Sequence, residues 1–270
     1  MWTLGIVGAG VMAEVMLSAL IDEGFAPSRI TASHRRRDRA DALAKRYGVT
    51  GTTDNRAAAA ADLVLLTVKP QTLPPVLAEI RGALRPDGLV ASIVAGAPTS
   101  VLQEGLDHRR VVRCMPNLPS RIRQGCTVWY APADVGPADL ERVAGILRAV
   151  GTEVRTTDEE NLDRATAVSG TGPAIVAHFV KAMLEAANFV GEPRALGLET
   201  VLATLAGTIE MIRRSDDHVA DLIDEVASPG GTTSRALQAL KNGRFSAVVT
   251  DAVDAAYQRT KEIKPKISTS

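Results

Sequence analysis

A glycine-rich turn close to the start of the chain constrains the fold more than any other feature. The segment GIVGAGVMA occupies residues 5–13; it closes a short apolar run and precedes a helical pattern that contains Met16, Leu17 and Leu20. A strand, a tight glycine turn and a helix in this order are typical of a dinucleotide site in a parallel sheet. The alternative is an ordinary turn between a strand and a helix. We expect a nucleotide site because the sequence fits on both sides of the turn.

Three small residues define the expected geometry of this turn. Gly8 permits the turn, Gly10 lets the backbone approach a pyrophosphate, and Ala13 is small enough for the helix to lie close to the strand. The phosphates would then face the free N–H groups and the positive dipole end of the helix.

The composition limits the classes of protein to consider. The chain has 270 residues, of which 46% are hydrophobic, and its 31 basic residues balance 31 acidic ones. Such a chain is long enough for two domains and a large core, and its balanced charge argues against a general nucleic-acid binder. Cys114 and Cys126 give no disulfide framework, so we expect a reducing, cytoplasmic compartment.

Targeting segments and metal sites are not expected. The chain enters its first apolar run directly, which leaves no room for a signal peptide, and no apolar run looks long enough to span a bilayer. The four histidines, His34, His108, His178 and His218, are scattered and show no metal-ligand spacing. We therefore expect no metal, no membrane and no nucleic acid among the partners.

The first half of the chain alternates short apolar runs with amphipathic stretches, which predicts parallel βαβ units in a doubly wound α/β sheet. We expect strands at residues 3–7, 30–33, 63–68, 89–94, 111–114, 126–130 and 151–155, and helices at 38–47, 71–84 and 137–150. This dinucleotide-binding domain is expected to cover residues 1–157.

The second half, residues 158–270, changes to helical periodicity, with breaks expected at 169–173, 191–193 and 228–231. Expected helices at 174–190 and 195–213 are apolar on most of their faces and must be buried on most of them. A domain of this size has little interior for such helices. We therefore expect them to intertwine with another subunit, in a homodimer or a ring of dimers. A self-contained helical bundle is the alternative.

The residues that end the second expected strand bear on the choice of cofactor. An NAD site places an acidic residue there to bind the ribose 2′-hydroxyl, whereas this chain has SHRRR at residues 33–37. A guanidinium grips a phosphate with a forked pair of donors, and Ser33 can add a hydroxyl. Asp38, the nearest acid, is expected in the following helix. The segment favours NADPH over NADH; a solvated helix start is the alternative.

Other loops follow the ends of expected strands. Asp54-Asn55 follows a presumed third strand that lies between the expected strands 30–33 and 63–68. With that strand counted, residues 68–71 end the fourth strand and residues 95–96 end the fifth. Because ligands of a doubly wound sheet sit beyond the carboxyl ends of its strands, we expect these loops to line the adenosine, ribose and nicotinamide.

Two glycine-rich motifs stand out in the second half, SGTGP at residues 169–173 and SPGGTT at residues 228–233, the latter before an expected helix at 234–240. Consecutive backbone N–H groups, hydroxyls and a helix N-terminus form a receptor for a small anion such as a carboxylate. The alternative is a helix cap with a flexible lead-in.

Together these segments resemble the pyrroline-5-carboxylate reductase family over essentially the whole chain. The motifs are GAGVMA (8–13), LLTVKPQ (65–71), RCMPNLP (113–119), SGTGPA (169–174) and SPGGTT (228–233), and the tail DAVDAAYQRTKEI (251–263) adds to them. The resemblance implies a Rossmann domain and a helical domain that swaps with a partner. It also implies NADPH-dependent hydride transfer to the C=N bond of 1-pyrroline-5-carboxylate, giving L-proline, with the substrate near the subunit interface.

The resemblance further implies which residues form the site. It places the substrate carboxylate on the backbone around Gly231, with the Thr233 hydroxyl near the ring nitrogen as an orienting group. The implied cofactor contacts are Gly8, Ala9, Gly10, Val11, Met12, Ala13, Ser33, Arg35, Arg36, Asn55, Val68, Lys69, Pro70, Ala95 and Gly96. The implied substrate contacts are Ser169, Pro173, Ser228, Gly230, Gly231, Thr232 and Thr233.

Several positions depart from the usual family pattern. Val11 stands where Asn is common, Leu118 where Thr is usual, Ile175 where Tyr is usual, Val219 where Pro is frequent and Ile223 where Lys is common. The departures leave open a paralogue that acts on a related cyclic imine acid and a nucleotide-binding protein without turnover. A reductase that acts on a deazaflavin is a further alternative, against which the SPGGTT loop argues.

Overall fold

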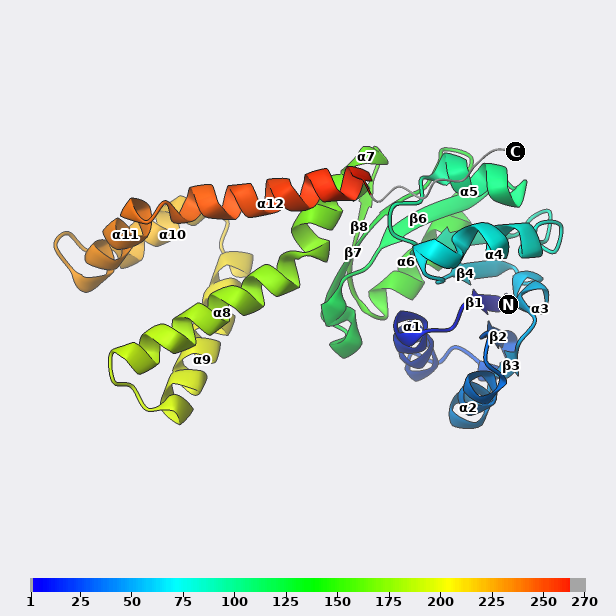
Figure 1. Cartoon of the computed structure of the whole chain (residues 1–270), viewed down its shortest axis with the longest axis horizontal. Helices are drawn as coiled ribbons and strands as arrows, with labels where there is room; N and C mark the ends of the chain where they lie inside the picture. Colours follow the sequence, from blue (N-terminus) through cyan, green and yellow to red (C-terminus); the bar gives the residue numbers. More distant parts are fainter. Residues whose placement is uncertain (1, 263–270) are drawn as a thin grey trace. The chain divides into compact units, whose positions relative to one another are not determined.

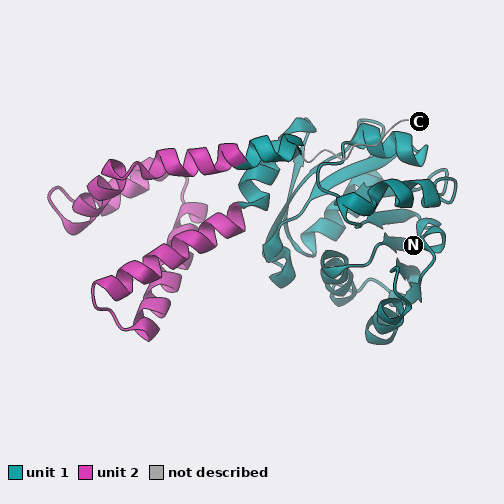
Figure 2. Ribbon diagram, viewed as in Figure 1, with its two compact units in different colours: residues 1–171, 256–270 teal, residues 172–255 magenta. Residues whose placement is uncertain are grey.

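Residues 2–262 are described in the computed structural model (Figure 1). They form two compact units (Figure 2), here called unit 1, residues 2–171 with 256–262, and unit 2, residues 172–255. The sequence predicts a domain boundary after residue 157, just past the last strand of unit 1. The division by contacts lies further along the chain, between Thr171 and Gly172.

Unit 1 is built on one eight-stranded sheet with the order β3-β2-β1-β4-β5-β6-β7-β8. All neighbouring strands are parallel except β6 and β7, which are antiparallel. The predicted doubly wound α/β architecture is therefore confirmed, and the expected strands are present with ends shifted by at most two residues. The strands are β1 (Leu4–Val7), β2 (Ile30–Ser33), β3 (Thr50–Thr52), β4 (Leu63–Leu66), β5 (Leu89–Ser92), β6 (Val111–Met115), β7 (Gly125–Tyr130) and β8 (Gly151–Thr156).

Helices cover both faces of this sheet. The segment expected as one helix over residues 71–84 is shorter, because a 3-10 turn occupies Pro70–Thr72 and the helix ends at Ile80. Gly82 then adopts a φ of +73°, a left-handed conformation that takes the chain away from the helix. The helices of unit 1 are α1 (Val11–Asp22), α2 (Arg37–Tyr47), α3 (Asn55–Ala59), α4 (Leu73–Ile80), α5 (Thr99–Leu106), α6 (Pro137–Arg148) and α7 (Glu160–Ala165), with 3-10 turns η1 (Pro27–Arg29), η2 (Pro70–Thr72) and η3 (Leu118–Ile122).

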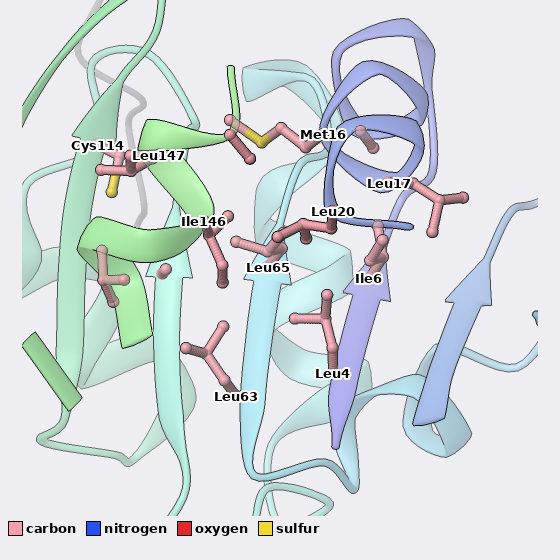
Figure 3. Close-up of a cluster of buried hydrophobic side chains, with 14 of the residues drawn as sticks. Leu4, Ile6, Met16, Leu17, Leu20, Leu63, Leu65, Cys114, Ile146 and Leu147 are labelled. Atoms are coloured by element: carbon pink, nitrogen blue, oxygen red, sulfur yellow. The ribbon is translucent and has the colours of Figure 1, made fainter. Parts of the chain in front are cut away.

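The core of unit 1 lies on both sides of the sheet. Leu63 and Leu65 of β4 belong to a cluster with α1, α2 and α6 (Figure 3). The alternate residues Val64 and Leu66 belong to a second cluster with α3, α4 and α5. Side chains of a strand alternate between its faces, so a strand buried on both faces is apolar throughout. Each fully buried leucine contributes about 1.5–3 kcal/mol of transfer free energy, which makes unit 1 stable through its own core.

Both tryptophans of the chain belong to unit 1. Trp129 is buried, and its indole N–H donates to Glu153 Oε2 at 2.6 Å. Trp2 contacts Phe25 edge-to-face, with ring centroids 4.7 Å apart. The cysteines are both free; burial raises the pKa of the Cys114 thiol far above its usual range.

Unit 2 consists of helices with almost no core. Among its described residues, Val201 and Leu222 are the buried hydrophobic side chains, and Phe179 contacts Phe245 with ring centroids 6.1 Å apart. Large apolar side chains on the same helices are exposed, including Ile209 and Phe189. The helices are α8 (Gly172–Phe189), α9 (Arg194–Arg214), α10 (Val219–Val226), α11 (Thr232–Asn242) and α12 (Phe245–Glu262), of which α12 continues into unit 1.

Two helices in the described part of the chain are long and apolar enough to cross a membrane, judged by length and composition alone. They are Glu160–Phe189 and Arg194–Arg214, and few residues in the most apolar stretch of each are buried. The sequence-based expectation concerned unbroken apolar runs, whereas these are whole helices with few charges. Large exposed apolar faces of this kind mark an interaction surface.

At residues 169–173, where the sequence predicts a break, the regular α-helix is interrupted, although the backbone stays helical. The chain passes from α7 through a π-helical turn at Thr166–Gly170 into α8. Glycine and proline normally end a helix. Here Gly170 lies in the π-turn, in which the Thr171 N–H is bonded to the Thr166 carbonyl at 3.1 Å. Pro173 lies in the first turn of α8, where the missing N–H of a proline is tolerated.

Candidate functional site

The glycine turn after β1 has the geometry that its sequence predicts. Gly8 adopts a φ of +86°, and a Cβ at this position would lie 2.4 Å from Val68 Cγ1. Any larger residue would therefore be strained and would clash. The Thr67 hydroxyl donates toward the carbonyls of Val7 and Gly8, at 3.0 and 2.9 Å. The end of β4 thus fixes the turn at the carboxyl end of β1.

The helix that follows this turn presents unsatisfied backbone donors. Gly10 is the N-cap of α1, and no side chain caps the helix there. A Cβ at Gly10 would meet only the Gly8 carbonyl oxygen, at 3.8 Å, so the space beside the turn is open. The N–H groups of Val11, Met12 and Ala13 lie in the first turn, where a helix offers them no acceptor. This is the arrangement that binds phosphate oxygens.

Ser33 lies beneath the turn rather than beside it. Its side chain is fully buried, and its hydroxyl accepts the Gly8 N–H at 3.3 Å while lying 2.7 Å from Asn55 Oδ1. The Ser33 carbonyl also accepts the Ala9 N–H at 2.7 Å. The expected approach of this hydroxyl to a cofactor phosphate does not fit its burial, because its bonds lie inside the fold.

Asn55 connects this buried network to the surface. Its Oδ1 faces Ser33, and its Nδ2 donates to Glu79 Oε2 of α4 at 2.8 Å. Asp54 caps the helix that starts at Asn55 by accepting the Arg56 N–H at 2.8 Å. The amide of Asn55 is therefore held in one orientation at the edge of the turn.

A cavity of about 320 Å³ opens where these elements meet. Six of the expected cofactor contacts line it, namely Gly8, Gly10, Arg35, Asn55, Val68 and Lys69. Four further lining residues, His34, Thr67, Thr72 and Val76, are additions to the sequence-based set. Thr72 and Val76 follow the VKPQ segment at a helical spacing of four, which is the signal that could have identified them. The expected contacts outside this lining are Ala9, Val11, Met12, Ala13, Ser33, Arg36, Pro70, Ala95 and Gly96.

The basic segment after β2 is divided between the cavity and the following helix. Arg35 and His34 line the cavity, whereas Arg36 is the N-cap of α2 and pairs with Asp38 at 3.1 Å. The backbone N–H of Arg36 donates to His34 Nδ1 at 3.1 Å, which orients the imidazole. Asp38 lies inside α2, as the sequence predicts, so the cavity has arginine and histidine at the position where an NAD site has an acid.

The SPGGTT motif forms a helix N-terminus in unit 2. Gly231 is the N-cap of α11 (Thr232–Asn242), without a capping side chain, and Gly230 has a φ of +75°. A Cβ at Gly231 would lie 2.4 Å from Ser228 Oγ, so the loop closes tightly around a glycine. The first N–H groups of α11, those of Thr232 and Thr233, have no acceptor within the helix. A small carboxylate fits these donors.

The SGTGP motif does not form such a receptor. Its hydroxyls bond back along the helix, with Ser169 Oγ donating to the Ala165 carbonyl at 3.0 Å and Thr171 Oγ1 donating to the Ala167 carbonyl at 2.5 Å. The N–H groups of residues 169–172 lie in helical backbone, and Pro173 has none. The motif therefore presents a shaped turn instead of free donors.

A parallel sheet with an open glycine turn, an uncapped helix and a cavity lined by arginine defines the class of nicotinamide-dinucleotide oxidoreductases. The comparisons identify the family within that class. Residues 159–263 match a family model described as pyrroline-5-carboxylate reductase dimerisation, and residues 3–96 match one described as NADP oxidoreductase coenzyme F420-dependent. The chain belongs to the pyrroline-5-carboxylate reductase family.

Relatives of full length support this assignment. The chain is 40% identical to a pyrroline-5-carboxylate reductase of Synechocystis over 97% of this chain and 98% of the relative. Among solved structures, a pyrroline-5-carboxylate reductase from Coxiella burnetii matches with a TM-score of 0.90 and 33% identity, over 97% of this chain and 98% of the other. A Plasmodium falciparum pyrroline carboxylate reductase with NADP bound matches with a TM-score of 0.86 and 28% identity, over the same shares.

Proposed function

We propose that this protein reduces 1-pyrroline-5-carboxylate to L-proline, with NADPH as the hydride donor. One observation carries the proposal: a chain that matches this family from end to end retains both the open glycine turn in unit 1 and the uncapped SPGGTT helix in unit 2. The first suits a dinucleotide, and the second suits the carboxylate of an imine acid.

The residues present in unit 1 fit NADPH. The turn from Gly8 to Ala13 would hold the pyrophosphate, because Gly10 leaves open space and α1 offers unpaired N–H groups. Arg35 and His34 would contact the 2′-phosphate, which a guanidinium binds with a forked pair of donors. The remainder of the NADPH molecule would be lined by Asn55, Val68 and Lys69. Pro70, Ala95 and Gly96 would line it further along the same edge of the sheet. NADH would bind more weakly because it lacks that phosphate.

The carboxylate of the substrate would lie on the N-terminus of α11. The backbone around Gly231 and Thr232 would hold it, with Ser228 and Gly230 shaping the loop, and Ser169 and Pro173 would contribute from the π-turn region. The Thr233 hydroxyl would hydrogen-bond to the ring nitrogen. Fixing the ring in this way contributes mainly orientation, which is a large part of the barrier to a bimolecular step.

The protein has little acid–base work to do in this reaction. Bound NADPH supplies the hydride that the C=N carbon accepts. A protonated imine is already an electrophile, so Thr233 needs only to orient the nitrogen and stabilise its N–H. The role of unit 1 is to hold the cofactor through the glycine turn, with Ser33 supporting that turn from below.

We further propose that the protein works as a homodimer in the cytoplasm. The match to a dimerisation family and the exposed apolar faces of α8 and α9 support a partner chain as the cover for unit 2. A ring of dimers would add further contacts between such homodimers. The proposed imine reduction requires neither nucleic acid nor a membrane.

A deazaflavin-dependent reductase is the alternative that one observation favours, since the description of the N-terminal family names coenzyme F420. That match covers residues 3–96 only, whereas the C-terminal unit and the full-length relatives point to the imine reductases. The departures from the family pattern at Ile175 and Ile223 leave two other functions open. One is reduction of a related cyclic imine acid by a paralogue, and the other is nucleotide binding without turnover. NADPH oxidation assayed with five-membered and six-membered imine acids distinguishes these possibilities.

The cofactor assignment is tested with a pair of variants. Arg35→Ala should weaken NADPH binding at least tenfold and NADH binding much less, because about 1.4 kcal/mol corresponds to a factor of ten and a charged hydrogen bond contributes about that much. Ser33→Ala should weaken both cofactors by a similar factor, since Ser33 acts through the Gly8 turn. The measurement is direct titration of each variant with each cofactor. Equal losses of NADPH and NADH affinity in Arg35→Ala would contradict the assignment of NADPH as the preferred cofactor.

The substrate assignment is tested at Thr233. Thr233→Ala should lower kcat/KM for the imine acid roughly tenfold, the effect of losing one hydrogen bond to a charged group, and NADPH affinity should barely change. Thr233→Ser, which keeps the hydroxyl, is the matched control and should restore most of the rate. A Thr233→Ala enzyme that loses NADPH binding but keeps its KM for the imine acid would show that the loop belongs to the cofactor site.

A further inference from the structure

One face of β6 (Val111–Met115) and of the segment that follows it bonds to the helix that leads toward unit 2. Residues on one face of an extended chain recur at every second position, and Arg113, Met115 and Asn117 follow this spacing. We call them the β6 row. Each contacts α7 or the π-turn Thr166–Gly170, and all of these contacts lie within unit 1.

The lower end of the β6 row is a buried ion cluster. The Arg113 side chain is 5% exposed and pairs with Asp163 of α7 at 2.6 Å and with Glu159 at 3.4 Å. Glu159 in turn accepts the N–H and the hydroxyl of Thr99, at 2.7 and 2.6 Å, which satisfies the start of α5. A buried cation with two carboxylate partners fixes the start of α7 in one position on the sheet.

The upper end of the row meets the π-turn. A Cβ on Gly170 would lie 3.4 Å from Met115 Cε, so the turn packs closely on that side chain. Asn117 Nδ2 donates to the Ser169 carbonyl at 3.1 Å, and Asn117 Oδ1 accepts the Cys126 N–H at 2.8 Å. The amide of Asn117 therefore joins strand β7 to the π-turn.

The sequence explains why the Ser169 carbonyl needs this donor. The α-helical pattern that resumes in α8 would pair the carbonyl of residue 169 with the N–H of residue 173, and residue 173 is proline, which has no N–H. A carbonyl left without a donor costs about 1–3 kcal/mol when it is shielded from water. The Asn117 amide supplies the donor that Pro173 removes.

We propose that Asn117 is a positioning residue for the substrate, because it holds the π-turn at Ser169 in the shape that Pro173 would otherwise leave unsupported. This inference rests on the proposed function, in which Ser169 and Pro173 border the imine acid. It assigns the side-chain amide of Asn117 a role in substrate affinity and none in cofactor affinity.

The test is a double-mutant cycle between Asn117 and Pro173. Asn117→Asp keeps the acceptor for the Cys126 N–H and removes the donor, so the KM for the imine acid should rise about tenfold, the equivalent of one hydrogen bond to a carbonyl. The NADPH dissociation constant should stay within about twofold. Pro173→Ala returns an N–H to residue 173, so Asn117→Asp should raise KM less than about threefold in that background.

Asn161→Asp is the matched control. Asn161 lies on α7, about one turn before the π-turn and outside the proposed site. Its Nδ2 donates to Thr156 Oγ1 at 3.0 Å. The Asn161→Asp variant should leave KM unchanged. If Asn117→Asp does not fold, Asn117→Ser replaces it in the cycle under the same criterion. An equal rise in KM in both backgrounds, or a parallel loss of NADPH affinity, overturns the proposal.

Failure of the proposed function gives a different result. If the wild-type protein does not reduce pyrroline-5-carboxylate, the substrate assignment is wrong whatever the variants do. Amide hydrogen exchange over residues 166–172 then tests the contact alone. Exchange should quicken more than about tenfold in Asn117→Asp and return toward the wild-type rate in the Pro173→Ala background. Unchanged exchange in Asn117→Asp would overturn the structural part of the inference.

Discussion

Unit 1 and unit 2 bury their apolar side chains in opposite ways. In unit 1, apolar side chains of the sheet and of six helices are buried on both faces of the sheet. In unit 2, among the described residues, only Val201 and Leu222 of the hydrophobic side chains are buried, although α8 and α9 are rich in them. The difference indicates that unit 1 is stabilised within one chain, whereas the apolar faces of unit 2 are those that the proposed homodimer would bury.

This contrast makes a general point about reading helices from sequence. A helix that is apolar on most faces indicates burial, but not whether the cover belongs to the same chain. The family description of residues 159–263 as a dimerisation region agrees with a cover that belongs to a second chain. The expected effects below should therefore depend on protein concentration in unit 2 and be independent of it in unit 1.

The largest expected effect is in the buried cluster of unit 1. Arg113→Leu removes the cation between Asp163 and Glu159 and should lower the free energy of unfolding by about 3–5 kcal/mol, the usual result of leaving a buried charge unpaired. Denaturant unfolding measures the loss, which should be the same at low and high protein concentration. Arg164→Leu is the control, because the Arg164–Glu160 pair is exposed. A loss that grows on dilution would place this cluster in the interface.

A smaller effect is expected in unit 2. Ile209 is 53% exposed on α9, and Ile209→Glu would place a charge in an apolar contact between subunits. The dimer dissociation constant should rise about a hundredfold, or about 2.7 kcal/mol, as measured by light scattering over a dilution series. Arg213→Ala on the same helix should have little effect. If Ile209→Glu leaves the assembly intact at every concentration, this face of α9 does not bear the interface.

The smallest expected effect is the pH dependence of one surface contact in unit 1. Hydrogen bonds from the Thr3 hydroxyl and N–H, both 2.7 Å to Asp62 Oδ2, hold the pKa of Asp62 below its ordinary value, and Arg85 adds to this. The lowered pKa means that the carboxylate stabilises the folded state above about pH 4 and that this contribution is lost as the pH falls through the lowered value. Asp62→Asn should cost about 1 kcal/mol at neutral pH, and its difference from wild type should shrink in acid. A constant difference across the acid range would contradict this.

The glycine turn was predictable because its causes are local. Gly8 needs a left-handed φ, and the strand before it and the helix after it are visible as adjacent patterns. The placement of Ser33 was not predictable in the same way. A serine at a strand end has the same sequence signature whether its hydroxyl faces a phosphate or the backbone below, and the partner that decides this, Asn55, lies 22 residues away.

The π-turn shows a second limit. Glycine and proline at residues 170–173 indicate a break, and locally they remove helix hydrogen bonds. Asn117, 52 residues earlier, donates to the Ser169 carbonyl and lets the helix continue. Sequence propensity indicates that helical conformation is unfavourable at residues 170–173. The hydrogen bond from Asn117, which is distant in the sequence, offsets part of that cost.

The positions of Trp2 and Trp129 have a consequence for spectroscopy. Both indoles lie in unit 1, Trp129 buried with its N–H bonded to Glu153 and Trp2 against Phe25, and the sequence has only these two. Intrinsic tryptophan fluorescence therefore reports on unit 1 alone, whereas the ellipticity at 222 nm reports on the helices of both units. The ellipticity of the unmodified protein thus contains a contribution from unit 2 that its fluorescence lacks. Transitions that fail to coincide would show that the two units melt separately, without any label.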